Sequence, residues 1–361
     1  MWADLEALLQ AGVKDGLFPG CAIAVRSATD EIFSVAVGQA EQTPQPRPAT
    51  LKTPWDLASI TKVLGATPVA MRLMADGRLD LDAPIRERIP DAPEGVTAAH
   101  CLSHTSGLPA WRALFEDFPD PDRWGTDDLR QQALRRAYTT PVFAPPGVAY
   151  VYSDLGMMLL CALLEHIGGE RIDAVWQREA RAAELRWGWP VAAAATEDCP
   201  ARGRVLVGEV HDLNTAVLGG ASTHAGLFGP VEAVAAAAAW QLRAWMGEAG
   251  EGLSPAVVRR FWSHRAVGSH HLGWDGVTPG KSTAGDRWPL TGVGHTGFTG
   301  GVLWIAPEKD VVVAFCSNRV HPHVEGGARP GATGPKTAAF RALRPKVFTA
   351  VVEALEADGR W

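Results

Sequence analysis

The chain has 361 residues, of which 47% are hydrophobic and 20% charged, a balance typical of a folded protein with a sizeable core. The 34 basic and 40 acidic residues give a net charge of −6, so the clustered positive charge that nucleic-acid binding requires is not expected. No apolar run approaches about 18 residues, and the sequence therefore predicts no membrane-spanning helix. The N-terminal stretch lacks the apolar core of a signal peptide, so we expect a cytoplasmic protein, or an extracytoplasmic one if a leader has been removed.

The first 77 residues predict a helix, a hairpin and a second helix. Apolar residues at helical spacing open the chain and stop near Gly16. Residues 21–27 and 31–38 are rich in β-branched residues and are separated by a short polar turn, which predicts two paired strands. A helix is predicted to begin near Ser59 and to end at Gly77, with a kink or local break at Pro68 because proline removes a backbone hydrogen bond.

The middle of the chain predicts helices, and strands return only near its end. Residues 78–214 carry little strand signal, and the helix predicted at 153–167 is apolar on almost every side, which is typical of a buried helix. The remaining elements follow in chain order: helices at 126–137 and 231–247, strands at 293–307 and 310–318, and a helix at 346–358.

This order predicts an α+β fold in which an antiparallel sheet is flanked by N- and C-terminal helices and interrupted by a large helical insertion. We expect residues 1–77 and 215–361 to form one discontinuous sheet domain and residues 78–214 a mainly helical inserted domain. The active site is expected between the two.

Ser59 and Lys62 form the first of three motifs that suggest chemistry. Residues three apart share a face of a helix, so the serine hydroxyl and the lysine ammonium can meet. A serine is a poor nucleophile alone, and a nearby lysine can accept its proton if desolvation lowers the pKa of the lysine. Alone, this spacing is common on solvated helices.

The second motif is Tyr152-Ser153-Asp154, which heads the buried helix, and the third is His295-Thr296-Gly297-Phe298 on a late strand. A tyrosine at the mouth of that helix can place its phenol beside the serine–lysine pair, while Ser153 or Asp154 caps the helix. Gly297 allows a ligand to approach the strand closely.

The order of these three motifs resembles that of the serine β-lactamase and penicillin-binding protein superfamily. With a tyrosine in the second motif, the sequence resembles the class C branch of that superfamily. That branch includes β-lactamases, DD-carboxypeptidases, D-aminopeptidases and esterases. Further segments fit the same group: LDLDAPI (79–85), LSHTSGLP (102–109), PPGVAYVYSDLG (145–156), GGASTHAGLF (219–228), GHTGFTGG (294–301) and SNRVHP (317–322).

The resemblance implies a role for each motif residue. Ser59 is expected to be the acylated nucleophile, with Lys62 and Tyr152 sharing the proton transfers. The backbone N–H groups of Ser59 and Phe298 are expected to form the oxyanion hole. The residues expected to bind substrate are Asp154, His295, Thr296 and Gly297.

Two residues depart from the pattern of the class C β-lactamases. Asp154 stands where asparagine is usual, and a carboxylate can pair with Lys62 and hold it charged. His295 stands where lysine is usual, and we expect it to bind a substrate carboxylate only when protonated, near neutral pH. Both changes favour an esterase or peptidase over a specialised antibiotic-destroying enzyme.

The sequence therefore predicts a serine hydrolase acting through an acyl-enzyme on a small-molecule or peptide ester or amide, with β-lactams among the candidates. The alternative is a catalytically weak penicillin-binding or ligand-binding protein on the same fold. Neither a cofactor nor a metal is expected, because the histidine spacings at 264–271 and 321–323 match no zinc pattern. His104 is interpreted as a polar residue of a tight turn that bonds the local backbone.

Overall fold

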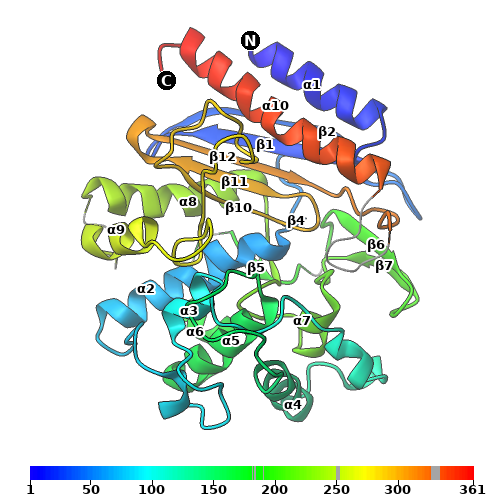
Figure 1. Ribbon diagram of the computed structural model, residues 1–361. Helices are drawn as coiled ribbons and strands as arrows, with labels where there is room; N and C mark the ends of the chain where they lie inside the picture. The colour runs from blue at the N-terminus through cyan, green and yellow to red at the C-terminus, as the bar shows by residue number, and fades with distance from the viewer. Residues whose placement is uncertain (181, 183, 190, 249–252, 327–333) are drawn as a thin grey trace.

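The computed structural model describes residues 1–180, 182, 184–189, 191–248, 253–326 and 334–361. Its centre is a seven-stranded antiparallel sheet built from both ends of the chain (Figure 1). In spatial order the strands are β3 (Arg47–Pro48), β2 (Glu31–Glu41), β1 (Gly20–Arg26), β12 (Val311–Ser317), β11 (Val302–Ala306), β10 (Val293–Thr296) and β9 (Asp275–Gly276). The predicted hairpin and the late strands are thus neighbours in one sheet, and the predicted α+β architecture is confirmed.

Helices cover both faces of this sheet. The terminal helices α1 (Trp2–Lys14) and α10 (Pro335–Ala357) pack together on one face, and α8 (Val231–Met246) packs against β1 and β12 on the other (Figure 1). Side chains alternate along a strand, so Ile23 and Val25 join the apolar cluster under the terminal helices while Ala22 and Ala24 face α8. The alanines on both sides of that second interface allow α8 to lie close to the sheet.

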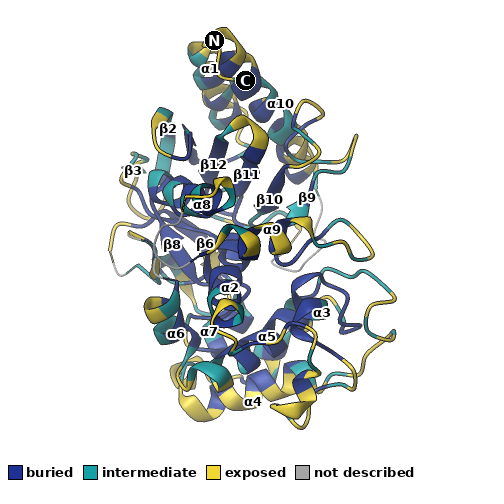
Figure 2. Ribbon diagram, turned by 90° about the vertical axis from the view of Figure 1, so that its left-hand side faces the viewer, coloured by how far each residue is buried: buried dark blue, intermediate teal, exposed yellow. Residues whose placement is uncertain are grey.

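The middle of the chain forms a helical layer below the sheet. Helix α5 (Asp154–Gly168) lies at its centre, packed against α3 (Ala98–Leu102), α4 (Asp127–Tyr138) and α6 (Ile172–Glu179). Figure 2 shows α5 buried and the outer surface of α4 exposed. The prediction of a buried helix at this point is therefore confirmed, and Ser153 caps it by accepting a hydrogen bond from the Gly156 N–H at 2.9 Å.

The segment around the first motif differs from the single helix that was predicted. It begins as a 3-10 turn, η1 (Ala58–Ile60), continues as the π-helical η2 (Lys62–Ala66) and becomes α-helical in α2 (Thr67–Ala75). The break predicted at Pro68 corresponds to the change from η2 to α2 directly before this residue. Pro68 lies in the first turn of α2, where its missing N–H breaks no α-helical hydrogen bond.

Two other elements also differ from expectation. A hairpin of β6 (Ala195–Cys199) and β7 (Arg204–Val207) lies within the stretch predicted to be helical, because its acidic residues hide the strand pattern. Helix α10 begins about ten residues earlier than predicted and contains Pro345, which marks a helix boundary in most sequences.

The remaining elements are short and connect these layers. They are β4 (Trp55–Asp56), η3 (Ile85–Glu87), η4 (Leu114–Asp117), η5 (Pro121–Arg123), β5 (Arg186–Trp187), α7 (Leu213–Val217), β8 (Leu227–Gly229), α9 (Pro255–Ser263) and η6 (Pro307–Lys309). One apolar cluster runs from the sheet into the helical layer, so the division into two domains at 77 and 215 stays a prediction. Among the helices of the described segments, none combines the length and the apolar character needed to cross a membrane.

Candidate active site

A sharp turn presents Ser59 to the solvent-accessible cleft. Ala58, directly before it, adopts a left-handed backbone with φ of 44°, a conformation that costs a non-glycine residue about 1–2 kcal/mol. The buried Asp56 carboxylate stabilises this turn by accepting hydrogen bonds from the N–H of Ala58 at 2.8 Å and of His211 at 2.7 Å. The strain therefore lies directly at the residue that positions Ser59.

Lys62 is completely buried beneath Ser59, and its ammonium has three hydrogen-bond acceptors. Nζ donates to Ser59 Oγ at 3.0 Å, to Asp154 Oδ1 at 2.7 Å and to the backbone carbonyl of His224 at 3.4 Å. Burial alone would lower the pKa of Lys62, but the Asp154 carboxylate and the Tyr152 hydroxyl outweigh it and raise that pKa. Lys62 is thus a charged, fully engaged group and not a free amine.

Tyr152 completes the group around Ser59. Lys62 Nζ lies 4.7 Å from the centroid of the tyrosine ring, and the pKa of the phenol responds to both Lys62 and Ser59, which places its hydroxyl beside them. Burial raises the pKa of Tyr152 further than the Lys62 charge lowers it, so the phenol is neutral near pH 7. The structure thus brings Tyr152 beside the hydrogen-bonded network of Ser59, Lys62 and Asp154.

A cavity of about 700 Å³ opens above this network. Six of the residues named from the sequence line it: Ser59, Tyr152, Asp154, Thr296, Gly297 and Phe298. Gly297 lies against the serine turn, where a Cβ would stand 2.7 Å from the carbonyl oxygen of Leu57, so a larger residue would push strand and turn apart. The oxyanion hole formed by the Ser59 and Phe298 N–H groups stays a prediction.

His295 does not line the cavity. This position does not agree with the role expected from the sequence, in which a protonated His295 binds a substrate carboxylate. Neighbouring residues of a strand point to opposite faces, and β10 directs Thr296 toward the cavity while His295 is 3% exposed. Burial, followed by the nearby Lys62 charge, lowers the pKa of His295 to about 3. The imidazole is therefore neutral near neutral pH, and Nδ1 lies 2.9 Å from the carbonyl oxygen of Thr296.

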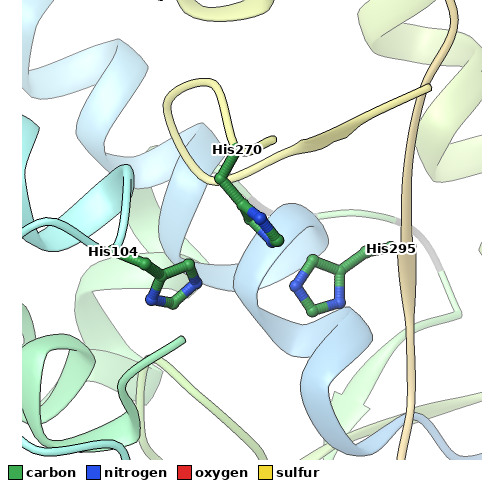
Figure 3. Close-up of side chains that lie close together, drawn as sticks. All are labelled: His104, His270 and His295. Carbon is green, nitrogen blue, oxygen red and sulfur yellow. The ribbon is translucent and has the colours of Figure 1, made fainter. Parts of the chain in front are cut away.

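Three buried histidines converge behind the tyrosine, a cluster that their spacing in the sequence does not reveal. One ring nitrogen each of His104, His270 and His295 lies within 4.8 Å of the others (Figure 3). Their ring centroids lie 4.4, 5.7 and 5.9 Å from that of Tyr152. Burial lowers the pKa of all three, so they surround the tyrosine as neutral rings.

The hydrogen bonds of these rings do not fit a metal centre with three histidine ligands. His104 Nδ1 accepts a hydrogen bond from the Ser153 N–H at 3.1 Å, so the proton of the neutral ring is on Nε2. His295 Nδ1 instead donates to the Thr296 carbonyl, which leaves the lone pair on Nε2. Because a metal requires a lone pair from every ligand, His104 cannot bind one through Nε2 in this arrangement.

His104 holds the second motif in place, a role that reaches beyond the local turn expected from the sequence. Its carbonyl accepts a hydrogen bond from the Val151 N–H at 2.9 Å, and its ring accepts one from the Ser153 N–H. Both neighbours of Tyr152 are thus fixed to one residue, whose own backbone is left-handed with φ of 57°. The interaction joins segments almost fifty residues apart, and its signal in the sequence is only the LSHTSGLP motif.

The sequence matches the family described as Beta-lactamase over residues 5–334. The chain belongs to that family. It is 28% identical over 321 residues to a putative D-alanyl-D-alanine carboxypeptidase of Escherichia coli K12, covering 78% of this chain and 72% of the relative. It is 34% identical over 188 residues to esterase EstB of Burkholderia gladioli, covering 48% of this chain and 47% of the esterase.

Solved structures agree on the fold. EstCE1, described as a hydrolase with promiscuous acyltransferase activity, superposes with a TM-score of 0.72 at 19% identity, covering 95% of this chain and 98% of EstCE1. The protein is therefore a β-lactamase-family serine hydrolase with the β-lactamase and transpeptidase fold.

Replacing His295 tests whether this residue is neutral in the fold. In the native state its pKa is about 3, whereas the unfolded chain has the ordinary value of about 6.5. The unfolded state thus binds a proton that the native state does not, and stability falls as the pH drops below about 6.5. His295→Asn keeps a donor for the Thr296 carbonyl but cannot titrate. The free energy of unfolding of the parent should decrease when the pH is lowered from 6.5 to 4.5. In His295→Asn we expect this decrease to be smaller by about 2–3 kcal/mol.

Urea denaturation at several pH values measures this difference. His323→Asn, at an exposed histidine, is the control and should follow the parent. Equal pH dependence in the parent and His295→Asn would show that His295 titrates alike in both states.

Proposed function

We propose that Ser59 is the nucleophile of an enzyme that hydrolyses esters or amides through an acyl-enzyme. The observation that carries this proposal is the 3.0 Å hydrogen bond between Ser59 Oγ and the buried Lys62 Nζ at the floor of the cavity. A polarised hydroxyl beside a cleft that admits a small substrate is the arrangement that nucleophilic catalysis requires. The names of the relatives, a carboxypeptidase and an esterase, support the same reaction class.

The route of the Ser59 proton follows from the charges of the network. Lys62 and Tyr152 both hold their protons in the resting state, so neither is a free base. When Ser59 attacks the substrate carbonyl, its proton passes to the Lys62–Tyr152 pair while Lys62 passes a proton to Asp154. The same groups return the proton to the leaving group, and the second half of the reaction repeats the exchange with water as the nucleophile.

A second candidate function is supported by the 2.7 Å bond between Lys62 and Asp154. A carboxylate that holds Lys62 charged slows any step that needs the amine, and the protein would then bind or acylate slowly without efficient turnover. D-amino-acid peptides, aryl esters and β-lactams are the substrates that would separate the two functions.

Removing the Ser59 hydroxyl tests the nucleophile. Ser59→Ala should abolish covalent labelling by a fluorescent fluorophosphonate and reduce ester turnover by at least about a thousandfold, because the oxygen that forms the proposed acyl bond is removed. Intact-protein mass spectrometry and circular dichroism would confirm the loss of the adduct and the retention of the fold. Labelling that persists in the folded variant would place the nucleophile elsewhere.

Removing the Tyr152 hydroxyl tests the proton route. Tyr152→Phe retains the ring among the histidines but loses the phenol, and turnover should fall by about a hundredfold or more. The matched control is Tyr138→Phe on α4, outside the cavity lining. A rate within a few fold of the parent would show that the phenol only packs and that Lys62 acts alone.

Asp154→Asn tests whether the Asp154 carboxylate belongs to the proton network. The Asp154 charge raises the pKa of both Lys62 and Tyr152, so its removal should shift the rising limb of the kcat/KM profile to lower pH by about one unit or more. Profiles from pH 5 to 10 would measure the shift, with Asp127→Asn at the exposed start of α4 as control. An unmoved limb would exclude Asp154 from the proton network.

A further inference from the structure

The three buried histidines behind Tyr152 each have one ring nitrogen without a partner. Nε2 of His104, of His270 and of His295 is buried and makes no hydrogen bond within the described part of the chain. The three residues are only 1, 6 and 3% exposed, so bulk water does not reach these atoms. A buried polar atom that makes no hydrogen bond is unfavourable, and three of them in one cluster point to a bound ligand.

The other nitrogen of each ring is engaged outside the cluster. The Nδ1 atoms of His104, His270 and His295 lie, in that order, 3.1 Å from the Ser153 nitrogen, 2.8 Å from the Tyr150 hydroxyl and 2.9 Å from the Thr296 carbonyl oxygen. Nε2 is therefore the nitrogen that each ring directs toward the other two (Figure 3). The converging nitrogens lie within 4.8 Å of one another, so an atom placed between them is about 2.8 Å from each, a normal hydrogen-bond length.

The tautomers of the rings determine what that atom must do. His104 carries its proton on Nε2 and is a donor there, whereas His295 carries its proton on Nδ1 and is an acceptor at Nε2. His270 resembles His295, because its Nδ1 lies 3.5 Å from the Asp275 carboxylate as well as beside the Tyr150 hydroxyl, and a carboxylate favours the proton on the nearer nitrogen. The cluster thus offers one donor and two acceptors.

This combination selects the chemical class of the ligand. A metal ion or an ammonium ion requires a lone pair from every ring, and an anion requires a proton from every ring. The ligand must instead accept one hydrogen bond and donate two. A water molecule does both, and buried waters in proteins typically make about three hydrogen bonds to polar groups that otherwise have no partner.

We propose that the Nε2 atoms of His104, His270 and His295 bind one buried water molecule, which joins three segments of the chain and holds Tyr152 in position. His104 fixes both neighbours of Tyr152 through their backbone N–H groups. His295 belongs to β10, and the residue after it, Thr296, lines the cavity. The water therefore connects the segment that carries the phenol to the strand that forms the opposite wall. The water site does not depend on the proposed function of Ser59, whereas its effect on turnover does.

The positions of the ring protons test the site in the intact protein without any substrate. Long-range proton–nitrogen NMR spectra of the 15N-histidine-labelled parent should show His104 protonated at Nε2, and His270 and His295 protonated at Nδ1. The Nε2 proton of His104 should also show cross-relaxation with a water resonance. A proton on Nε2 of His270 or His295, or no cross-relaxation with water, would overturn the proposal.

A crystal structure of the parent provides an independent test. We expect one density peak at about 2.6–3.2 Å from all three Nε2 atoms, without anomalous scattering at the zinc absorption edge. A peak at about 2.0–2.1 Å with an anomalous signal would identify a metal ion and refute the water. A position without density would refute the water as well.

Two variants of His270 test whether the water positions Tyr152. His270→Phe removes the acceptor, whereas His270→Gln can place its amide oxygen near the former Nε2, and both variants lose the bond to Tyr150. We expect kcat for an aryl ester to fall about tenfold or more in His270→Phe, with KM within about threefold of the parent, because a displaced catalytic group reduces the rate more than it reduces binding. His270→Gln should recover most of the loss, and His323→Phe, at an exposed histidine, should match the parent.

Equal losses in His270→Phe and His270→Gln would show that the acceptor does not position Tyr152, and the positioning role would fail. If the parent hydrolyses no ester, the proposed function of Ser59 fails, while the NMR spectra and the density still decide whether the water is bound. The two proposals can therefore fail separately.

Discussion

The burial of the Lys62 ammonium is the constraint on which the rest of the site depends. A charge removed from water is tolerated only when hydrogen bonds and an opposite charge replace its hydration. Its three acceptors come from the serine turn, the head of α5 and the loop that precedes β8. Acceptors up to 162 residues from Lys62 in the sequence must therefore converge on its nitrogen, and this convergence closes the helical layer against the sheet.

The same charge determines what can lie next to it. A second cation within a few ångströms would be repelled in a medium of low dielectric constant, and the surrounding histidines are accordingly neutral. Their neutrality also agrees with the hydrogen bonds that orient them, since His104 accepts at Nδ1 where His295 donates. Tyr152 is thus held between a cation on one side and apolar or neutral rings on the other, so its position follows from the electrostatics of the whole group.

The sequence was informative where the chemistry is local or belongs to an ordered set of motifs. Ser59 and Lys62 are three residues apart, so their contact survives although the segment is 3-10 and π-helical and not α-helical. The buried helix α5 and its cap were predictable from composition and from one polar residue at its start. The joining of Tyr152 and Asp154 to the pair came from the order of the motifs and not from periodicity.

Tertiary packing determines the features of the site that the sequence did not predict. Side chains alternate along β10, so His295 and Thr296 cannot both face the cavity. Which of the two faces it depends on how the strand is oriented in the sheet. The histidine cluster joins residues 104, 270 and 295, and no local pattern indicates that their rings will meet. Arg319 and Arg344 likewise come from separate elements and meet at the ring of Phe340, a contact that no local pattern in the sequence indicates.

The cavity wall carries charges of both signs. At the serine end the Lys62 ammonium is balanced by the Asp154 carboxylate at 2.7 Å, so that end carries little net charge before substrate arrives. Away from Ser59, the same cavity is lined by Arg319, Arg341 and Arg344 and by the carboxylates of Glu197 and Asp212, each of which lies beside a histidine. Charges of both signs on the wall offset one another, so the Lys62–Asp154 pair is the one charged group in direct contact with Ser59 that the described hydrogen bonds show. The substrate carbonyl therefore meets a serine whose oxygen is already hydrogen-bonded to a balanced cation, and the field that acts on the developing charge comes from this pair and not from the distant wall.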